Sequence, residues 1–223
     1  MRELSLVLER KEWRCLHCKF DRVNPRPLLF IISAFDQYFA KLLAANATER
    51  EEVDRELAAI RDKIRESFGS ENMSILCQLI PNVRRIVLEE EMLLDSYVGN
   101  FDCSGDTEAS TCRLHQLFGL LLKAISQRPL LMFLDDLQWA DCASLDLMTA
   151  LVHQQINDGT HVLFVGSYRL NEITDSDPLA VHIKSIQMLS NVTLTEIVLN
   201  GFSCDEVNII VSEALSYPQR LSR

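Results

Sequence analysis

One uninterrupted apolar run that ends on two acids constrains the fold of this chain more than any other segment. Residues 130–134 read Leu-Leu-Met-Phe-Leu, and Asp135 and Asp136 follow at once. Bulky apolar residues without polar alternation are typical of a strand buried on both faces, as in a central parallel sheet. Pro129 suits the first position of such a strand, where no ladder hydrogen bond is lost. Ligands of open α/β sheets bind beyond the carboxyl ends of the strands, so both acids are candidate site residues.

The chain after these acids alternates between helical and strand patterns. Asp141 is a good N-cap for a helix that closes near Gly159, and Ser203 with Glu206 forms a capping box for a last helix through Leu215. Further strands are predicted at 161–165 and 192–199, and a helix at 179–189. Strand and helix in this alternation predict a parallel sheet with right-handed crossovers.

The chain before the apolar run is mainly helical in pattern. Apolar residues at helical spacing predict helices over 28–45, 48–68, 71–80 and 113–125, with Thr48 and Glu51 as a capping box of the second. Residues 1–11 read as the end of a helix, 13–20 are rich in strand formers, and 95–110 form a polar loop. Cys15 and Cys18 are a lone CxxC without a matching second pair, and we predict no metal site there.

The charge balance and the cysteine content exclude several classes of protein. The 223 residues include 22 basic and 32 acidic ones, a net charge of −10, which argues against a nucleic-acid-binding protein. Seven cysteines, an odd number, favour a reducing compartment over a disulfide framework. With no signal peptide and no apolar run long enough for a membrane span, we expect a soluble cytoplasmic protein without membrane contacts.

Polar side chains also follow the next predicted strand. Arg169 comes shortly after residues 161–165, and neighbouring parallel strands lie about 4.8 Å apart. Asp135, Asp136 and Arg169 could therefore flank one phosphate group, with carboxylates for Mg²⁺ and water and a guanidinium for terminal phosphate charge. The same sequence pattern is also consistent with an Asp–Arg ion pair at the sheet edge, or with a buried strand that ends in an Asp-Asp turn.

Several segments resemble one family. Residues 129–147 (PLLMFLDDLQWADCASLDL), 161–173 (HVLFVGSYRLNEI) and 177–179 are similar to the AAA-type ATPase domain of the STAND signalling NTPases. The closest resemblance is to the predicted-ATPase signalling regulators, where this domain lies beside kinase or sensor modules. Shorter similarities cover 19–21, 27–39, 79–83 and 197–199, so the resemblance extends over nearly all of the chain.

The resemblance implies a fold and a division into domains. It implies a three-layer αβα P-loop-NTPase-like parallel sheet, truncated at the first strand. Residues 1–199 would be the ATPase core without its P-loop, and 200–223 the start of a helical lid domain. In the family the missing strand lies inside the sheet next to residues 161–165, so we expect a gap in the strand order.

The resemblance also implies roles for five residues. Asp135 would be the Walker B acid that holds Mg²⁺ through water and so helps to bind ATP. Asp136 would activate the hydrolytic water, and Arg169 would be the sensor arginine for the terminal phosphate. Trp139 and Asp141 would be structural or coupling residues, and Trp139 alone also reads as a core or interface aromatic.

One departure from the family concerns the phosphate-binding loop. None of the seven glycines is followed by lysine, so the printed residues contain no GxxxxGK[ST] segment. We therefore expect Asp135 and Asp136 to face solvent unpaired, with no lysine beside them.

The functional expectation is an ATP-binding and hydrolysing switch module of a signalling regulator, incomplete as written. Its partners would be kinase or sensor modules in the same chain and further copies that assemble through the ATPase domain. Two alternatives stay open: a pseudo-ATPase or gene fragment that acts as an interaction module, and a replication-initiator-like AAA module. The acidic charge balance counts against the second alternative.

Overall fold

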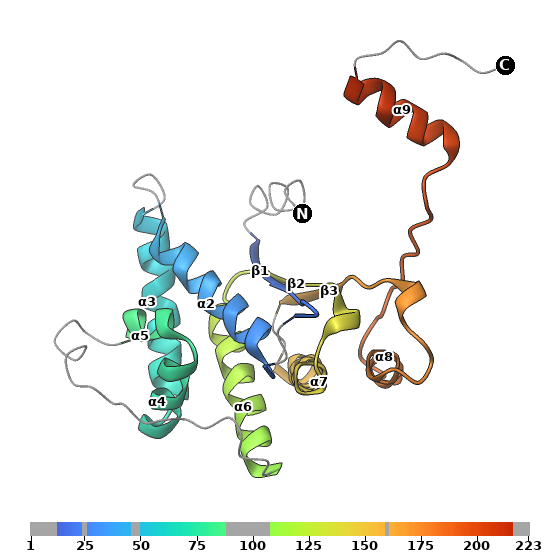
Figure 1. Cartoon of the computed structure of the whole chain (residues 1–223). Helices are drawn as coiled ribbons and strands as arrows, with labels where there is room; N and C mark the ends of the chain where they lie inside the picture. The colour runs from blue at the N-terminus through green and yellow to red at the C-terminus, as the bar shows by residue number, and fades with distance from the viewer. Residues whose placement is uncertain (1–12, 24–25, 46–49, 88–107, 159–160, 216–223) are drawn as a thin grey trace. The chain divides into compact units, whose positions relative to one another are not determined.

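The computed structural model describes residues 13–23, 26–45, 50–87, 108–158 and 161–215 (Figure 1). The chain divides into two compact units, residues 1–192 and 193–223, and each is described by itself. The expected domain boundary between residues 199 and 200 stays a prediction. The predictions for residues 1–11, for the Thr48 cap and for most of the 95–110 loop lie outside the described residues.

The first unit contains a parallel sheet of three strands. The strands are β1 (Arg14–Lys19), β2 (Leu130–Asp135) and β3 (Val162–Gly166), in the order β1-β2-β3. The apolar run forms the central strand, and Leu130, Leu131, Met132 and Leu134 are buried as predicted. The sheet puts Lys19 opposite Asp135, and Leu134 opposite Gly166. The carboxyl ends of all three strands therefore meet at one edge, where the acids lie.

The helices of the first unit begin and end close to the predicted positions. They are α2 (Leu29–Leu43), α3 (Arg50–Ser67), α4 (Ser70–Leu79), α5 (Pro81–Val87), α6 (Glu108–Ile125), α7 (Cys142–Asp158) and α8 (Pro178–Gln187). In the view of Figure 1, α3, α4 and α5 form a group on the left, and α6 and α7 lie below the sheet. Helix α2 packs on β1, α6 packs on both α3 and α7, and α7 packs on α8. The α/β class of the P-loop-NTPase type is confirmed.

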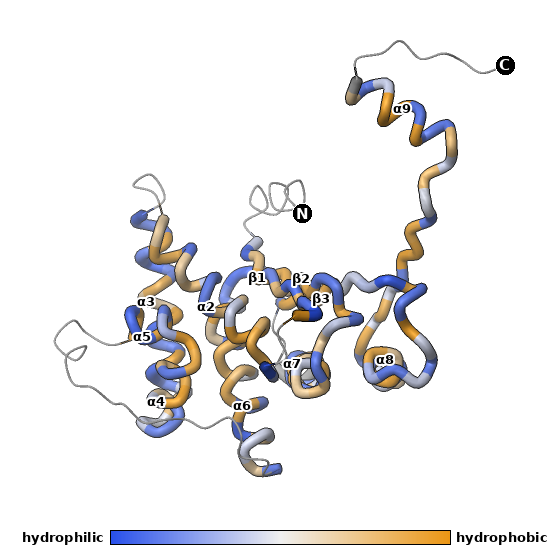
Figure 2. Tube along the Cα trace, in the orientation of Figure 1, coloured by the Kyte–Doolittle hydropathy of each residue, from blue (hydrophilic) through white to orange (hydrophobic). Residues whose placement is uncertain are grey.

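Amphipathic faces bury the helices against this core. In α3, Val53, Leu57, Ile60 and Ile64 are buried, whereas the charged residues between them are mostly exposed. Figure 2 shows the same alternation of hydrophobic and hydrophilic residues along the helix. An apolar stripe at this spacing stabilises a helix through tertiary burial, at about 25 cal/mol for each Å² of apolar surface removed from water.

Two helix boundaries differ from the sequence prediction. Helix α6 begins at Glu108, so residues 108–110 are helical where a loop was expected. An acid in the first turn favours this earlier start, because it faces the positive end of the helix dipole. Pro81 ends α4 as expected but also begins α5, which was not predicted. Proline is favoured at the first helical position, where its missing N–H has no partner to lose.

The strand predicted at 192–199 is wrong, because these residues form no strand in the structure. A strand is stable only when its backbone pairs with a neighbour. In the described residues, the only strand paired with β3 is β2. The described strands pair without interruption, β1 with β2 and β2 with β3, so the expected gap in the strand order does not occur.

The second unit contains one described helix, α9 (Cys204–Leu215). Its capping box is confirmed: the Glu206 N–H donates to Ser203 Oγ at 3.3 Å, and the Ser203 N–H donates to Glu206 Oε2 at 2.7 Å. None of the helices described in either unit has the length and apolar character that a membrane crossing needs.

Candidate functional site

Asp135 and Asp136, here called the acid pair, lie where β2 turns into the short 3₁₀ helix η2 (Leu137–Trp139). Asp136 has φ 59°, in the left-handed region that few residues other than glycine adopt, although Asp is among the more tolerant. The hydroxyl of Ser167, just after β3, donates to Asp135 Oδ1 at 2.6 Å and accepts from the Asp136 N–H at 3.2 Å. The backbone of Ser167 also bonds Leu134 and Leu137. The ends of β2 and β3 thus hold the acid pair in one place.

Lys19 completes this cluster from the end of β1. Its Nζ lies 3.5 Å from Asp135 Oδ2 and 3.3 Å from Asp136 Oδ2. The expectation of unpaired acids without a lysine is therefore wrong. Lys19 is far from the acids in sequence, and only the parallel register of β1 and β2 brings it opposite Asp135.

These contacts shift the pKa values in the directions expected of an ion pair. Burial raises the pKa of Asp135, but the hydrogen bond from Ser167 and the charge of Lys19 outweigh it, and the net pKa is lowered. The hydrogen bond to Asp136 and the charge of Asp135 raise the pKa of Lys19. The carboxyl of Asp135 and the ammonium of Lys19 are therefore both charged at neutral pH.

Arg169 reaches the site through its backbone rather than through its guanidinium. The Gln138 side chain donates to Asp136 Oδ1 at 3.2 Å and accepts from the Arg169 N–H at 3.3 Å. The Arg169 guanidinium donates to Glu172 Oε1 at 2.9 Å and lies 5.6 Å from the centre of the Trp139 ring. Its expected part in reading a terminal phosphate stays a prediction, and in this conformation the guanidinium is engaged elsewhere.

The other two predicted residues have clear structural contacts. Trp139 is half-buried and packs against the apolar core. Asp141 accepts hydrogen bonds from the Ser144 N–H at 2.9 Å and from the Ser144 hydroxyl at 2.6 Å. The N-cap predicted for α7 is therefore confirmed.

Sequence reasoning missed Lys19, Ser167 and Gln138 as members of the site. A signal for two of them existed, because Lys19 and Ser167 stand at the ends of predicted strands. The carboxyl ends of neighbouring parallel strands meet at one edge, so this rule places both residues at the edge that holds the acid pair, although it does not say which side chains reach the acids.

All four carboxylate oxygens of the acid pair have partners within the chain, which bears on whether the pair could hold Mg²⁺. Carboxylates are suitable ligands for Mg²⁺. However, Ser167 and Gln138 each donate to one oxygen of the pair, and Lys19 lies against the other two. Among the residues that the structure describes, no group of three or more His, Cys, Asp or Glu could hold a metal. This arrangement does not fit an open Mg²⁺ site, and the printed residues hold no phosphate-binding loop for ATP.

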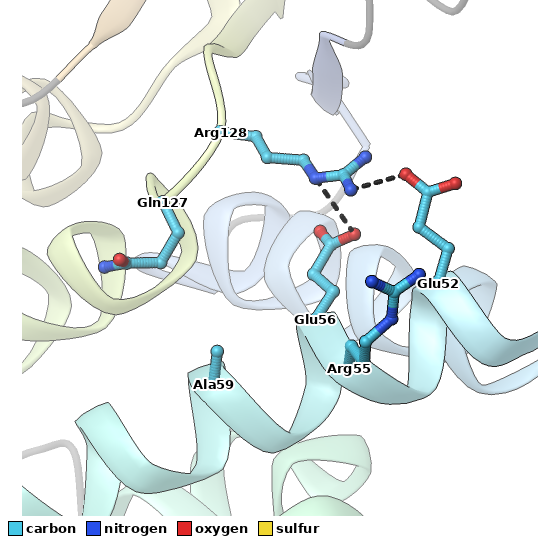
Figure 3. Close-up of a pocket in the computed structure, with 6 residues that line it drawn as sticks. All are labelled: Glu52, Arg55, Glu56, Ala59, Gln127 and Arg128. Atoms are coloured by element: carbon cyan, nitrogen blue, oxygen red, sulfur yellow. Dashed lines mark hydrogen bonds and ion pairs between the residues drawn. The ribbon is translucent and has the colours of Figure 1, made fainter.

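A surface hollow near the amino ends of β1 and β2 is lined by ion-paired side chains (Figure 3). It measures about 250 Å³ and is lined by Glu52, Arg55, Glu56, Ala59, Gln127 and Arg128. Arg128 contacts both Glu52 and Glu56. Arg14 Nε donates to both carboxylate oxygens of Glu56, at 3.0 and 3.1 Å, and a terminal nitrogen of Arg14 also donates to Glu56 Oε2. The pairing ties the amino ends of β1 and β2 to α3, so we interpret the hollow as structural.

A second hollow of about 470 Å³ lies at the start of α4. Arg113 lines it and donates to Asn72 at 2.7 and 2.9 Å and to Glu71 at 2.8 Å. Its charge is thus already neutralised within the fold. Neither hollow includes the acid pair.

The parallel sheet is flanked by helices and ends in two acids on its central strand, which is the architecture of α/β proteins that bind ligands beyond the carboxyl ends of their strands. The family model described as AAA ATPase domain matches residues 1–165, which is more than half of the 223 residues. The chain therefore belongs to the AAA ATPase domain family, and the resemblance to an AAA-type ATPase domain is confirmed. No curated protein and no solved structure matches the chain.

Proposed function

We propose that this nucleotide-binding ATPase module is the ATP-dependent switch of a signalling regulator, working beside kinase or sensor modules of the same protein. The observation that carries the proposal is the acid pair, held on the rigid end of the central strand by Ser167. Copies of the module would assemble through this domain.

The different positions of the two acids suggest a different role for each carboxylate. Asp135 belongs to the strand, and both the strand ladder and Ser167 fix it. Asp136 stands on the left-handed turn after the strand, and Gln138 orients its Oδ1. Of the two, Asp136 is better placed to orient a water molecule, since a catalytic base must be aimed by its neighbours.

The test measures phosphate release from ATP by the 223-residue chain and by a form extended upstream in its gene. We expect turnover only in a form that also contains a GxxxxGK[ST] segment, because phosphoryl transfer depends on positioning of the phosphates. In that form Asp136→Asn should lower turnover about 100-fold and keep nucleotide binding. The exposed Asp62 on α3 gives a matched control, Asp62→Asn, which should leave turnover unchanged.

A second candidate function is a pseudo-ATPase that acts as an interaction module. The observation that favours it is the pairing of Lys19 with both acids and of Arg169 with Glu172, so that these charged groups already have partners within the chain. Absence of turnover in the extended form, with nucleotide binding retained, would support this candidate. Unchanged turnover in Asp136→Asn would instead assign the two acids to a structural turn.

A further inference from the structure

Each of the four carboxylate oxygens of the acid pair already has a protein neighbour that can donate a hydrogen bond or carries positive charge. Asp135 Oδ1 accepts from Ser167, and Asp136 Oδ1 accepts from Gln138. The two Oδ2 atoms both lie against the Lys19 ammonium, at 3.5 and 3.3 Å. In the described part of the chain, the ammonium is thus the charged group that lies against the carboxylates of both acids.

The backbone fixes the position from which Lys19 reaches the acids. Lys19 stands in register with Asp135, and the next residue, Phe20, donates its N–H to the Asp135 carbonyl at 3.0 Å. Phe20 itself is fully buried, which anchors the end of β1. Although the Lys19 side chain is 60% exposed, its Cα cannot move away from the acids without breaking this pairing.

The charge of the cluster follows from these contacts. Two carboxylates alone carry two negative charges, and the ammonium reduces the sum to one. A divalent cation at the pair would approach the same Oδ2 atoms and meet the positive charge of Lys19 at close range. The energy of this repulsion is proportional to the product of the two charges, and it weakens binding of the cation.

We propose that Lys19 is a built-in counter-cation that takes the place of a divalent metal at the acid pair, so that the pair binds divalent cations weakly while Lys19 is present. This inference concerns the same acids as the proposed function, but it does not depend on it, because the metal titration needs no nucleotide.

The experiment titrates the full 223-residue chain with Mn²⁺ alone and follows binding by the paramagnetic relaxation of water protons. We expect Lys19→Met to bind Mn²⁺ about tenfold more tightly than the wild type, because two uncompensated carboxylates then face the ion. Lys19→Arg keeps the positive charge and should bind as weakly as the wild type. Asp135→Asn, added to Lys19→Met, should abolish the gain.

The matched control is Lys63→Met, which removes the same charge from an exposed ion pair with Glu66 on α3. It should leave Mn²⁺ affinity unchanged, so that any gain in Lys19→Met is local. Equal affinity in Lys19→Met and the wild type, no measurable binding by Lys19→Met, or an equal gain in Lys63→Met would each overturn the proposal. None of these results would affect the ATP turnover test of the proposed function.

Discussion

The hydroxyl of Ser167 donates a 2.6 Å hydrogen bond to Asp135 Oδ1 and so joins the end of β3 to the end of β2. This bond is one of the contacts that lower the pKa of Asp135 against the effect of burial. A carboxyl with a lowered folded-state pKa adds stability above its unfolded pKa, and that stability is lost as the pH falls through the folded pKa.

Removal of this hydroxyl should therefore shift the titration of Asp135. In Ser167→Ala we expect the pKa of Asp135 to rise, because the hydrogen bond that opposes the effect of burial is lost. The stability that the protein loses when Asp135 is protonated in acid should then be smaller. Carboxyl-carbon NMR across an acid titration measures the shift. Ser185→Ala on α8, where the hydroxyl bonds the His182 carbonyl, should leave the Asp135 titration unchanged.

The ion pair at the amino ends of the strands should contribute measurably to stability. The Glu56 side chain is only 6% exposed and neutralises Arg14. We expect Glu56→Ala to lower the free energy of unfolding by about 3 kcal/mol, since it leaves a partly buried guanidinium without its partner. Urea unfolding measures this, and Glu66→Ala, which breaks an exposed pair, should cost less than about 1 kcal/mol. A loss in Glu56→Ala no larger than in Glu66→Ala would contradict the prediction.

Asp141 should stabilise the folded protein chiefly as the N-cap of α7. Asp141→Ala removes the acceptor for both the N–H and the hydroxyl of Ser144, whose side chain is fully buried. We expect a loss of about 1 to 2 kcal/mol in thermal or urea unfolding. Asp141→Asn keeps a capping oxygen and should recover most of the loss. If Asp141→Asn were as unstable as Asp141→Ala, the charge rather than the cap would be the relevant feature.

His17 should make the stability of the first unit depend on pH. Its Nε2 is buried without a hydrogen-bond partner in the described structure, and burial lowers its pKa. The unfolded chain then binds a proton more readily than the folded one. Stability should be fully present above about pH 6.5, the ordinary pKa of histidine, and should be lost as the pH falls towards the folded pKa.

Urea unfolding at pH 7.5 and pH 5.5 tests this dependence on His17. The variant His17→Leu should lose less stability between the two pH values than the wild type does. A part of the loss should remain, because burial also lowers the pKa of His115. Replacement of the exposed His161 by Gln should not alter the dependence. If His17→Leu lost as much stability between pH 7.5 and pH 5.5 as the wild type does, the pH dependence would belong to groups other than His17.

The sequence by itself determined the features that depend on local burial and on local hydrogen bonds. The apolar run of β2 must be covered on both faces, and the stripe of α3 must face a core, whatever the rest of the chain does. The caps at Asp141 and Ser203 are made between residues three positions apart, so their spacing alone predicts them. The family resemblance depended on the same contiguous segments.

Only the tertiary structure decided which distant groups meet the acid pair. Lys19 and Ser167 reach it because the register of the parallel strands puts three carboxyl ends at one edge, and no local pattern encodes a register. The Arg169 guanidinium turns to Glu172 and Trp139 because a long flexible side chain takes whichever partners the fold offers. Residues 192–199 have the composition of a strand but form none, because a strand requires a neighbour and composition cannot supply one.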